Sequence, residues 1–453
     1  MAARAPRPPL PPGPHLVVGL ARSGKAAAHA LLARGERVIG LDAGAPAGIA
    51  ALGEAGVELH TGEDGLELLE RVGCVIKSPG VPREAPVIER ALRRGVPVLG
   101  ELELGWRLLE NETIAVTGTN GKTTTVELIG HIHREAGLPV AVAGNVGAPL
   151  SGFVGRVDPA TTIVCEASSF QLEDALAFAP EAAVLLNIAP DHLDRHGSLE
   201  RYTAAKLALF ARQTPEDLAV APLEPFAEGL PGRAREVRFG VGSGAALARV
   251  GERLRWRGEA GDGDLDLIGV GELGLRGEHN VANAMAAAAV CLARGLDVEA
   301  VRAGLATFAG VAHRLEEVAR EEGVLYVNDS KATNVASAVV ALAAFPDQGV
   351  HLIAGGQGKG QDFGPLREPV AEHCRGVYLI GEDGPLIGAA LAGLDVPVHE
   401  CGDLEHALAR ARAAARAGEV VLLSPACASF DQFDDYEARG ESFRELVQAQ
   451  PHS

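Results

Sequence analysis

Residues 113–124 read TIAVTGTNGKTT, and this stretch decides the fold of the middle of the chain. TIAVT is a short β-rich run and a helical pattern starts at Lys122, so the glycine-rich segment between them is a strand-to-helix turn. Gly118 and Gly121 let the backbone point its N–H groups at an anion beside the helix N-terminus. Lys122 reaches terminal phosphates, and Thr123 is placed to bind magnesium. The pattern indicates a nucleotide-phosphate site, although it lacks the first glycine of the full motif.

Alternating strand and helix patterns extend on both sides of this stretch. Apolar runs such as LVVGLA and RVIGLD precede it, while AAVLLNI, VHLIAGG and EVVLLSP follow it. A glycine-rich segment at residues 237–275 has short strand-like pieces and little helical period. We therefore expect an α/β protein of three domains: a Rossmann-like N-terminal domain, a central P-loop ATPase-type parallel sheet with a small β appendage, and a C-terminal Rossmann-like α/β domain. The expected bounds are a Pro-rich disordered tail at 1–14 and domains at 15–100, 101–310 and 311–453.

Composition limits the classes of partner. Lys and Arg number 41 against 60 Asp and Glu, which gives a net charge of -19. A surface of that sign repels a phosphate backbone on average, so no nucleic acid is expected as a partner. The six cysteines are scattered without a CxxC pair, which is typical of reduced packing residues. Because no run is apolar for long enough to cross a bilayer, we expect a cytoplasmic protein without a membrane partner.

A second glycine turn, GLARSG, runs from Gly19 to Gly24 after the first strand. Asp42 ends the next strand, where a ribose ligand would stand. An alanine replaces the glycine that lets backbone approach a pyrophosphate, which disfavours NAD. Binding of another nucleotide and a purely structural turn stay open about equally.

Candidate magnesium ligands follow other strand ends. Glu166 ends a strand in CEASSFQLE, and His192 follows another in APDHLDRHG. Since the carboxyl ends of parallel strands meet at one edge, we expect Glu166, His192 and Thr123 to share a crevice. Lys206 lies on the next helix, where a lone lysine is usually solvated. A lysine kept neutral near a metal would instead take up CO2 as a carbamate, and the pattern alone does not suggest this.

Ten motifs in a fixed order resemble the Mur ligases, and among them the branch that adds D-glutamate. The motifs are GTNGKTT, GNVG, EASSFQLE, PDHLDRHG, RYTAAK, GEHNVANAMAA, AHRLE, NDSKATN, GGQGKGQDF and SPACASFDQFDDYEARGESF. Residues that match the family run from residue 19 to residue 443, which is nearly the whole chain. The resemblance implies an ATP-dependent ligase that joins D-glutamate to UDP-N-acetylmuramoyl-L-alanine through an acyl phosphate, in peptidoglycan precursor synthesis.

The resemblance also implies which residues form the site. The catalytic set would be Lys122, Glu166, His192 and Lys206. ATP would contact Gly118, Thr119, Asn120, Gly121, Lys122, Thr123, Thr124, Asn280, Asn283, Arg314, Asp329 and Lys331. The UDP substrate would contact Arg22, Ser23, Asp42, Ser78, Pro79, Gly80, Asn145 and His192. D-glutamate would contact Thr333, Lys359, Ser424 and Phe430. Two Mg2+ ions would be held by Thr123, Glu166, His192 and Lys206 as a carbamate, in a monomer whose partners are these small molecules.

Two other functions stay open at this point. A relative such as a folylpolyglutamate synthetase would share the ATP site but not the sugar nucleotide, and the segment at residues 424–430 and a substrate screen distinguish it. A nucleotide-binding regulator would lack catalysis, and ATP turnover distinguishes that one.

Overall fold

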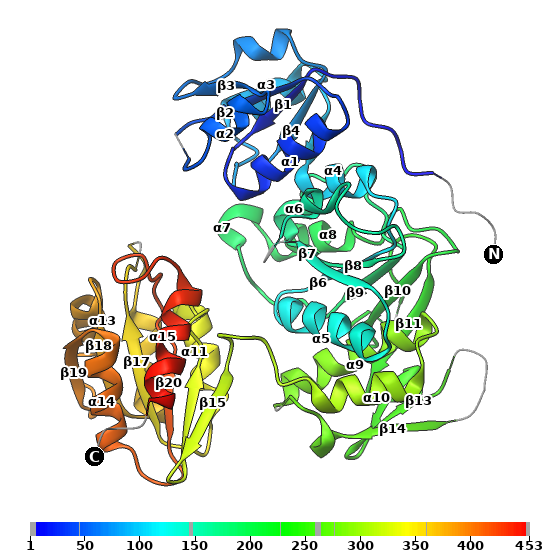
Figure 1. Cartoon of the computed structure of the whole chain (residues 1–453). Coiled ribbons are helices and arrows are strands. Elements are labelled where there is room, and N and C mark those ends of the chain that lie inside the picture. The colour runs from blue at the N-terminus through cyan, green and yellow to red at the C-terminus, as the bar shows by residue number, and fades with distance from the viewer. Residues whose placement is uncertain are drawn as a thin grey trace. The chain divides into compact units, whose positions relative to one another are not determined.

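The computed structural model describes residues 6–44, 46–144, 148–226, 228–258, 264–275, 277–358 and 360–449. The chain folds as two compact units, Met1–Phe308 and Ala309–Ser453 (Figure 1). Among the described strands, two sheets lie in the first unit and one in the second. The α/β class and the three sheet-based domains expected from the sequence are confirmed.

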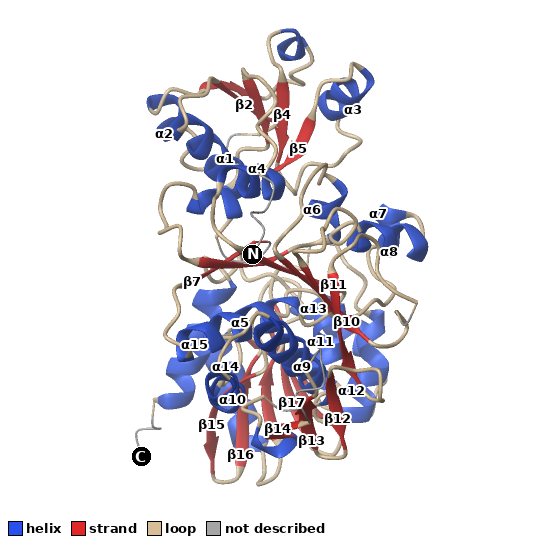
Figure 2. Ribbon diagram, turned by 90° about the vertical axis from the view of Figure 1, so that its right-hand side faces the viewer, coloured by secondary structure: helices blue, strands red, loops and turns tan. Residues whose placement is uncertain are grey.

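The N-terminal sheet is parallel throughout its described strands, in the order β3-β2-β1-β4-β5. Its strands are β1 (His15–Val18), β2 (Val38–Asp42), β3 (Glu58–Thr61), β4 (Cys74–Lys77) and β5 (Val98–Gly100). Its helices are α1 (Arg22–Ala33), α2 (Ala50–Glu54), α3 (Pro86–Arg93) and α4 (Glu101–Leu108). Strands β1 and β4 are wholly buried, as expected of a parallel sheet covered on both faces (Figure 2).

The Pro-rich segment before β1 is not a disordered tail over residues 6–14. The Arg7 guanidinium donates to the backbone oxygens of Trp106, Leu109 and Asn111 at 2.6 to 2.7 Å. It also lies 2.9 Å from the Glu181 carboxylate. The Arg7 guanidinium thus provides hydrogen bonds to backbone carbonyls at and just after the end of α4. The Pro-rich composition of the segment does not reveal these partners, because they lie far away in the sequence.

The central sheet has the described strand order β14-β13-β12-β11-β10-β9-β6-β8-β7. Its strands are β6 (Thr113–Thr117), β7 (Val140–Gly144), β8 (Thr162–Glu166), β9 (Ala182–Leu185), β10 (Leu218–Pro222), β11 (Arg235–Gly240), β12 (Leu247–Val250), β13 (Arg253–Trp256) and β14 (Leu265–Gly269). Its helices are α5 (Lys122–Glu135), α6 (Ser169–Glu173), α7 (Leu193–His196), α8 (Leu199–Leu207), α9 (Glu278–Ala293) and α10 (Val298–Thr307). The expected β appendage continues this sheet, because β11 pairs with β10 and only β12, β13 and β14 pair antiparallel.

The second unit contains one mixed sheet, whose described order is β15-β16-β20-β17-β18-β19. Its strands are β15 (Glu316–Glu321), β16 (Val324–Asn328), β17 (Val350–Gly355), β18 (Cys374–Ile380), β19 (Val398–Gly402) and β20 (Val420–Leu423). Its helices are α11 (Val335–Leu342), α12 (Arg367–His373), α13 (Gly384–Leu391), α14 (Leu404–Ala414) and α15 (Tyr436–Gln448). Of the strands described in this unit, only the edge strand β15 runs antiparallel to its neighbour.

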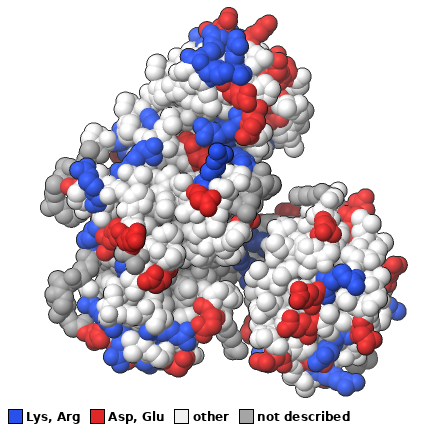
Figure 3. Space-filling view, turned by 180° about the vertical axis from the view of Figure 1, so that it is seen from behind, with Lys and Arg blue, Asp and Glu red and all other residues white. Residues whose placement is uncertain are grey.

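The surface charges and the cysteines have the arrangement expected from the composition. On the face drawn in Figure 3, basic side chains form small groups bordered by acidic ones. The six cysteines are unpaired, and all except the half-buried Cys401 are buried. Among the described residues, the helices are all too short or too polar to cross a membrane.

Candidate functional site

The glycine turn after β6 has the geometry of a phosphate loop. Gly118 has φ 155° and Gly121 has φ 84°, a backbone region that suits glycine. The Lys122 ammonium donates to the backbone oxygens of Gly118 at 3.0 Å and Thr119 at 2.8 Å, so it folds back over the loop. The loop also exchanges two hydrogen bonds with the Asn187 side chain, through the N–H and carbonyl of Asn120. The turn is therefore fixed before any anion binds.

Asn280 and Asn283, expected to approach the nucleotide, lie on α9 next to this loop. The Asn283 amide donates to the Asn280 side-chain oxygen at 3.1 Å. A Cβ added at Gly121 would collide with Asn283 Oδ1, so the asparagine lies directly against the turn. Gly121 and Asn283 are far apart in the sequence, so no local pattern predicts this contact, which depends on the packing of α9 on α5.

Glu166 is buried at the end of β8 and accepts a hydrogen bond from the Thr123 hydroxyl at 2.8 Å. The strand order places β8 beside β6, which brings these two predicted metal ligands together. A cavity of about 290 Å³ opens at this point, lined by Lys122, Glu166, Ser168, Ser169, Phe170, Asp191, His192, Tyr202 and Lys206. The four expected catalytic residues thus face one cavity.

Lys206 is not a solvated helical lysine. It is 1% exposed, and its ammonium donates to the Gly118 carbonyl oxygen at 2.7 Å. Its nitrogen lies 4.5 Å from the Tyr202 ring centroid. Burial, followed by the nearby positive charge of Lys122, lowers the pKa of Lys206 to about 7. A large share of this amine is therefore neutral and nucleophilic near physiological pH.

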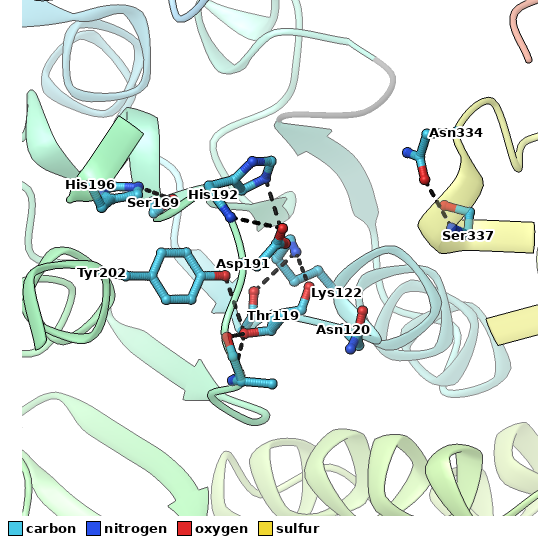
Figure 4. A network of polar contacts seen from close by, with 12 residues as sticks. Thr119, Asn120, Lys122, Ser169, Asp191, His192, His196, Tyr202, Asn334 and Ser337 are labelled. Carbon is cyan, nitrogen blue, oxygen red and sulfur yellow. Dashed lines mark hydrogen bonds and ion pairs between the residues drawn. The ribbon is translucent and has the colours of Figure 1, made fainter. Parts of the chain in front are cut away.

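His192 lies at the mouth of the cavity in a left-handed backbone conformation, with φ 50°. Its side chain is 50% exposed, and its Nε2 is 3.6 Å from the Asp191 carboxylate. Figure 4 shows both residues beside Lys122 and Thr119, with Tyr202 on the neighbouring helix. The Tyr202 hydroxyl is 3.1 Å from the Thr119 hydroxyl.

These side chains fit magnesium only together with other oxygen donors. No cluster of three or more His, Cys, Asp or Glu residues that could hold a metal exists within the described ranges. Mg2+ usually takes one or two carboxylates and completes its shell with water and substrate phosphates. The Glu166 carboxylate and the Thr123 hydroxyl beside a phosphate loop match that pattern, and a carbamate on Lys206 would add a second anionic ligand.

Of the residues expected to contact UDP, six lie together at the carboxyl ends of β1, β2 and β4, whereas His192 lines the cavity beside the phosphate loop. The six are Arg22, Ser23, Asp42, Ser78, Pro79 and Gly80. The Asp42 carboxylate accepts from the backbone N–H groups of Leu20 at 2.6 Å and Gly44 at 2.8 Å. The Ser78 hydroxyl donates to the Gly19 carbonyl oxygen at 2.6 Å. Both side chains therefore support the turn itself. Arg22 and Gly80 are exposed at the same edge, whereas Ser23 and Pro79 are half-buried.

In the second unit, Asp329 and Ser424 follow the paired strands β16 and β20. The Ser424 hydroxyl is fully buried and donates to the Asp329 carboxylate at 2.7 Å, so its hydrogen goes to a neighbouring side chain rather than to the surface. Burial raises the pKa of Asp329 to about 7. Lys331 lies 5.7 Å from the Tyr436 ring centroid. Phe430, in contrast, is 63% exposed.

Arg314 and Thr333, both half-buried, flank this edge of the second unit. Asn145 and Lys359, predicted for the UDP substrate and for D-glutamate, lie outside the described residues. Sequence reasoning missed Tyr202, Phe170 and Asp191, although each lies within a quoted motif. Their residue types alone are compatible with core packing or a solvated turn, so only the cavity identifies them.

Family models match most of the chain. The Mur ligase MurD-like N-terminal domain matches residues 14–100, the Mur ligase middle domain 116–291, and the Mur ligase glutamate ligase domain 313–427. Curated relatives named UDP-N-acetylmuramoylalanine--D-glutamate ligase match over nearly their whole length. The protein from Pelotomaculum thermopropionicum is 42% identical, covering 95% of this chain and 96% of the relative, and that from Rubrobacter xylanophilus is 45% identical, covering 95% and 97%.

Solved structures agree on the fold. The UDP-N-acetylmuramate-alanine ligase MurC from Thermotoga maritima has a TM-score of 0.58 at 21% identity, covering 96% of this chain and 99% of that one. The MurF ligase from Thermotoga maritima, solved with ADP, has a TM-score of 0.56 at 17% identity, covering 91% and 94%. Three family models match most of the chain, and relatives at 42% and 45% identity match 95% of it. The chain therefore belongs to the Mur ligase family.

Proposed function

We propose that the protein joins D-glutamate to UDP-N-acetylmuramoyl-L-alanine with consumption of ATP, as a cytoplasmic step of peptidoglycan precursor synthesis. Mur ligases are ATP-dependent enzymes that form amide bonds and generally use Mg2+. The relatives at 42% and 45% identity carry the name of this reaction, which supports the choice of substrates.

One observation carries the proposal: Lys122, Glu166, His192 and Lys206 line a single cavity at the end of the phosphate loop. A glycine-lined loop alone is compatible with simple nucleotide binding. A buried carboxylate and a lysine of lowered pKa at the same cavity add the groups that phosphoryl transfer to a carboxylate needs.

The chain's own residues supply positioning and charge. The muramoyl-alanine carboxylate attacks the γ-phosphate in line, and the bond to the β-phosphate oxygen breaks, which gives an acyl phosphate and ADP. Lys122 stabilises the negative charge on the transferring group, for which it leaves the loop carbonyls that it contacts now. Bound magnesium would neutralise phosphate oxygens, with Glu166 and Thr123 oriented toward each other to hold it. The D-glutamate amine then displaces phosphate from the activated carbonyl.

Lys206 acts in this proposal as a carbamate. Its neutral amine attacks CO2 and releases one proton, which leaves an anionic carbamate on Lys206 that would hold one of two magnesium ions. The lowered pKa supports this, because only the neutral amine reacts. Lys206→Ala should lose nearly all turnover, and acetate should restore part of it by placing a carboxylate in the vacated space, whereas bicarbonate should not. Wild-type activity in this variant would remove the carbamate.

The remaining assignments follow the family pattern. The N-terminal turn with Arg22, Ser23, Asp42 and Ser78 to Gly80 would take the UDP group, with Asn145 and His192 nearer the muramoyl group. Arg314, Asp329 and Lys331 would complete the ATP site, and Thr333, Lys359, Ser424 and Phe430 would take D-glutamate. The domain bounds proposed for these roles are 15–100, 101–310 and 311–453, in a monomer.

The direct test is release of inorganic phosphate from ATP by the purified protein. We expect release only when UDP-N-acetylmuramoyl-L-alanine and D-glutamate are both present, with product formation in equal amount. L-glutamate, L-alanine and diaminopimelate are the matched acceptor controls. Equal release with any other acceptor, or with a folate substrate, would refute the assignment.

A further inference from the structure

The loop that carries Asp191 and His192 has a strained backbone at the point where it meets the cavity. The φ of 50° at His192 places a residue with a Cβ in the left-handed region, which costs about 1 kcal/mol or more. Such a conformation persists only where surrounding contacts hold it. The backbone N–H groups of Arg195 and His196 both donate to the His192 carbonyl oxygen, at 3.1 and 3.0 Å, and so form a turn that ends at His196.

His196 anchors this turn to helix α6. Its side chain is fully buried, and its Nε2 is 3.0 Å from the Ser169 hydroxyl oxygen. Its Nδ1 is 3.1 Å from the Glu173 carboxylate, although the two atoms are not aligned as a hydrogen bond. Ser169 and Glu173 are the first and last residues of α6, four positions apart, so they face the same side of the helix. The imidazole is therefore held between two polar side chains of one helix, and Figure 4 shows its contact with Ser169.

The Phe170 ring joins this anchor to His192. Phe170 stacks on His196 with ring centroids 5.4 Å apart and an interplanar angle of 11°. It also contacts His192, with centroids 4.9 Å apart at 53°. Since both Phe170 and Ser169 line the cavity, the position of the His196 ring is transmitted directly to the cavity wall.

We propose that His196, bonded to Ser169, is a positioning residue that fixes Asp191 and His192 at the cavity and thereby sets the affinity of its divalent metal site. This rests on the proposed function only in that the cavity holds a metal with a nucleotide. Groups that orient metal ligands without touching the metal change its affinity by about 10-fold to 100-fold when removed. The chain offers such a group here, since His196 does not itself line the cavity.

Binding of Mn2+ in the presence of ADP, followed by the paramagnetic resonance signal of free Mn2+, tests this without any turnover. His196→Phe keeps a ring against Phe170 but loses both polar contacts, and Ser169→Ala removes the same hydrogen bond with a smaller change. We expect each to weaken Mn2+ binding about 10-fold or more, with metal-free ADP binding unchanged. The double variant His196→Phe/Ser169→Ala should bind Mn2+ no more weakly than the single variant with the lower affinity. The reason is that all three variants lose the same hydrogen bond between His196 and Ser169.

His131→Phe is the matched control. His131 also contacts a hydroxyl, Thr307 at 2.8 Å, and lies 3.7 Å from the carboxylate of Glu135, but it does not line the cavity. Wild-type Mn2+ affinity in His196→Phe, an equal loss in His131→Phe, or losses that multiply in the double variant would each overturn the inference. A wild-type protein that binds ADP but no Mn2+ would instead refute the proposed metal site on which the inference depends.

Discussion

Lys206→Met should make the metal-free protein more stable while it abolishes ligase activity. A buried ammonium is costly, and methionine fills a similar volume without charge. Burial and Lys122 lower the pKa of Lys206 from its ordinary 10.5 to about 7. The folded state therefore binds fewer protons than the unfolded state between pH 7 and pH 10.5. Wild-type stability should rise with pH across that window, and the full penalty is present below pH 7.

The expected gain in the free energy of unfolding is the penalty that corresponds to the pKa difference, minus the favourable contacts that the lysine side chain makes. The pKa difference corresponds to about 5 kcal/mol at pH 6. The lost contact between the ammonium and the Tyr202 ring offsets about 2 kcal/mol. Gly118 keeps a partner for its carbonyl, because Lys122 also donates to it at 3.0 Å. We therefore expect about 3 kcal/mol of added stability at pH 6 and almost none at pH 10.

Urea unfolding followed by tryptophan fluorescence measures this change, because both tryptophans, Trp106 and Trp256, lie in the first unit. The buffers contain no bicarbonate or nucleotide, so that the free amine is compared with methionine. Lys25→Met, at a half-buried lysine whose ammonium donates to the Ala47 carbonyl oxygen near the surface, is the control and should show no pH-dependent gain. Two results would refute the idea that burial destabilises the charged amine of Lys206. One is a lower free energy of unfolding for Lys206→Met than for wild type at pH 6, and the other is a gain in that free energy that is the same at pH 6 and pH 10.

Three further substitutions test other contacts. Lys77→Met should cost about 3 kcal/mol in urea unfolding, because the buried Asp174 carboxylate, now 2.7 Å from the ammonium, keeps only its 3.8 Å ion pair with the half-exposed Arg83, and adding Asp174→Leu should recover most of that loss. If the double variant does not regain stability, the lost Lys77–Asp174 ion pair is not the cause of the destabilisation. Arg439→Met should raise the KM for D-glutamate and the KM for ATP together, since this buried guanidinium bonds the Cys427 carbonyl before Phe430 and also the carbonyl of Ser330 beside Lys331, and a change in only one KM would contradict this. Gly121→Ala should abolish ADP binding in calorimetry through collision with Asn283, and retained binding would show that the turn is looser than described.

The phosphate loop was predictable because its parts are adjacent in sequence. A strand, two glycines, a lysine and the start of a helix occupy twelve residues, and the backbone preferences of glycine determine the turn. The carboxyl-edge argument also placed Glu166 near Thr123, because β8 pairs with β6.

Contacts made by distant packing were not predictable in the same way. Nothing local in the sequence indicates that Lys206 is buried against Gly118, 88 residues away, or that its pKa is lowered. The Pro-rich start was expected to be disordered, yet Arg7 finds carbonyl partners about a hundred residues along the chain. The hydrogen bond from the Ser424 hydroxyl to Asp329, 95 residues away, was not predictable either, and the role of Ser424 toward D-glutamate stays a prediction.

The fate of one oxygen atom tests the central claim most directly. UDP-N-acetylmuramoyl-L-alanine labelled with 18O in both carboxylate oxygens is turned over with ATP and D-glutamate, and the released phosphate is analysed by mass spectrometry. Attack of the carboxylate on the γ-phosphate transfers one labelled oxygen into every phosphate released. Phosphate free of label, formed together with the amide, would show that no acyl phosphate forms and would contradict the role assigned to the cavity around Lys122, Glu166, His192 and Lys206.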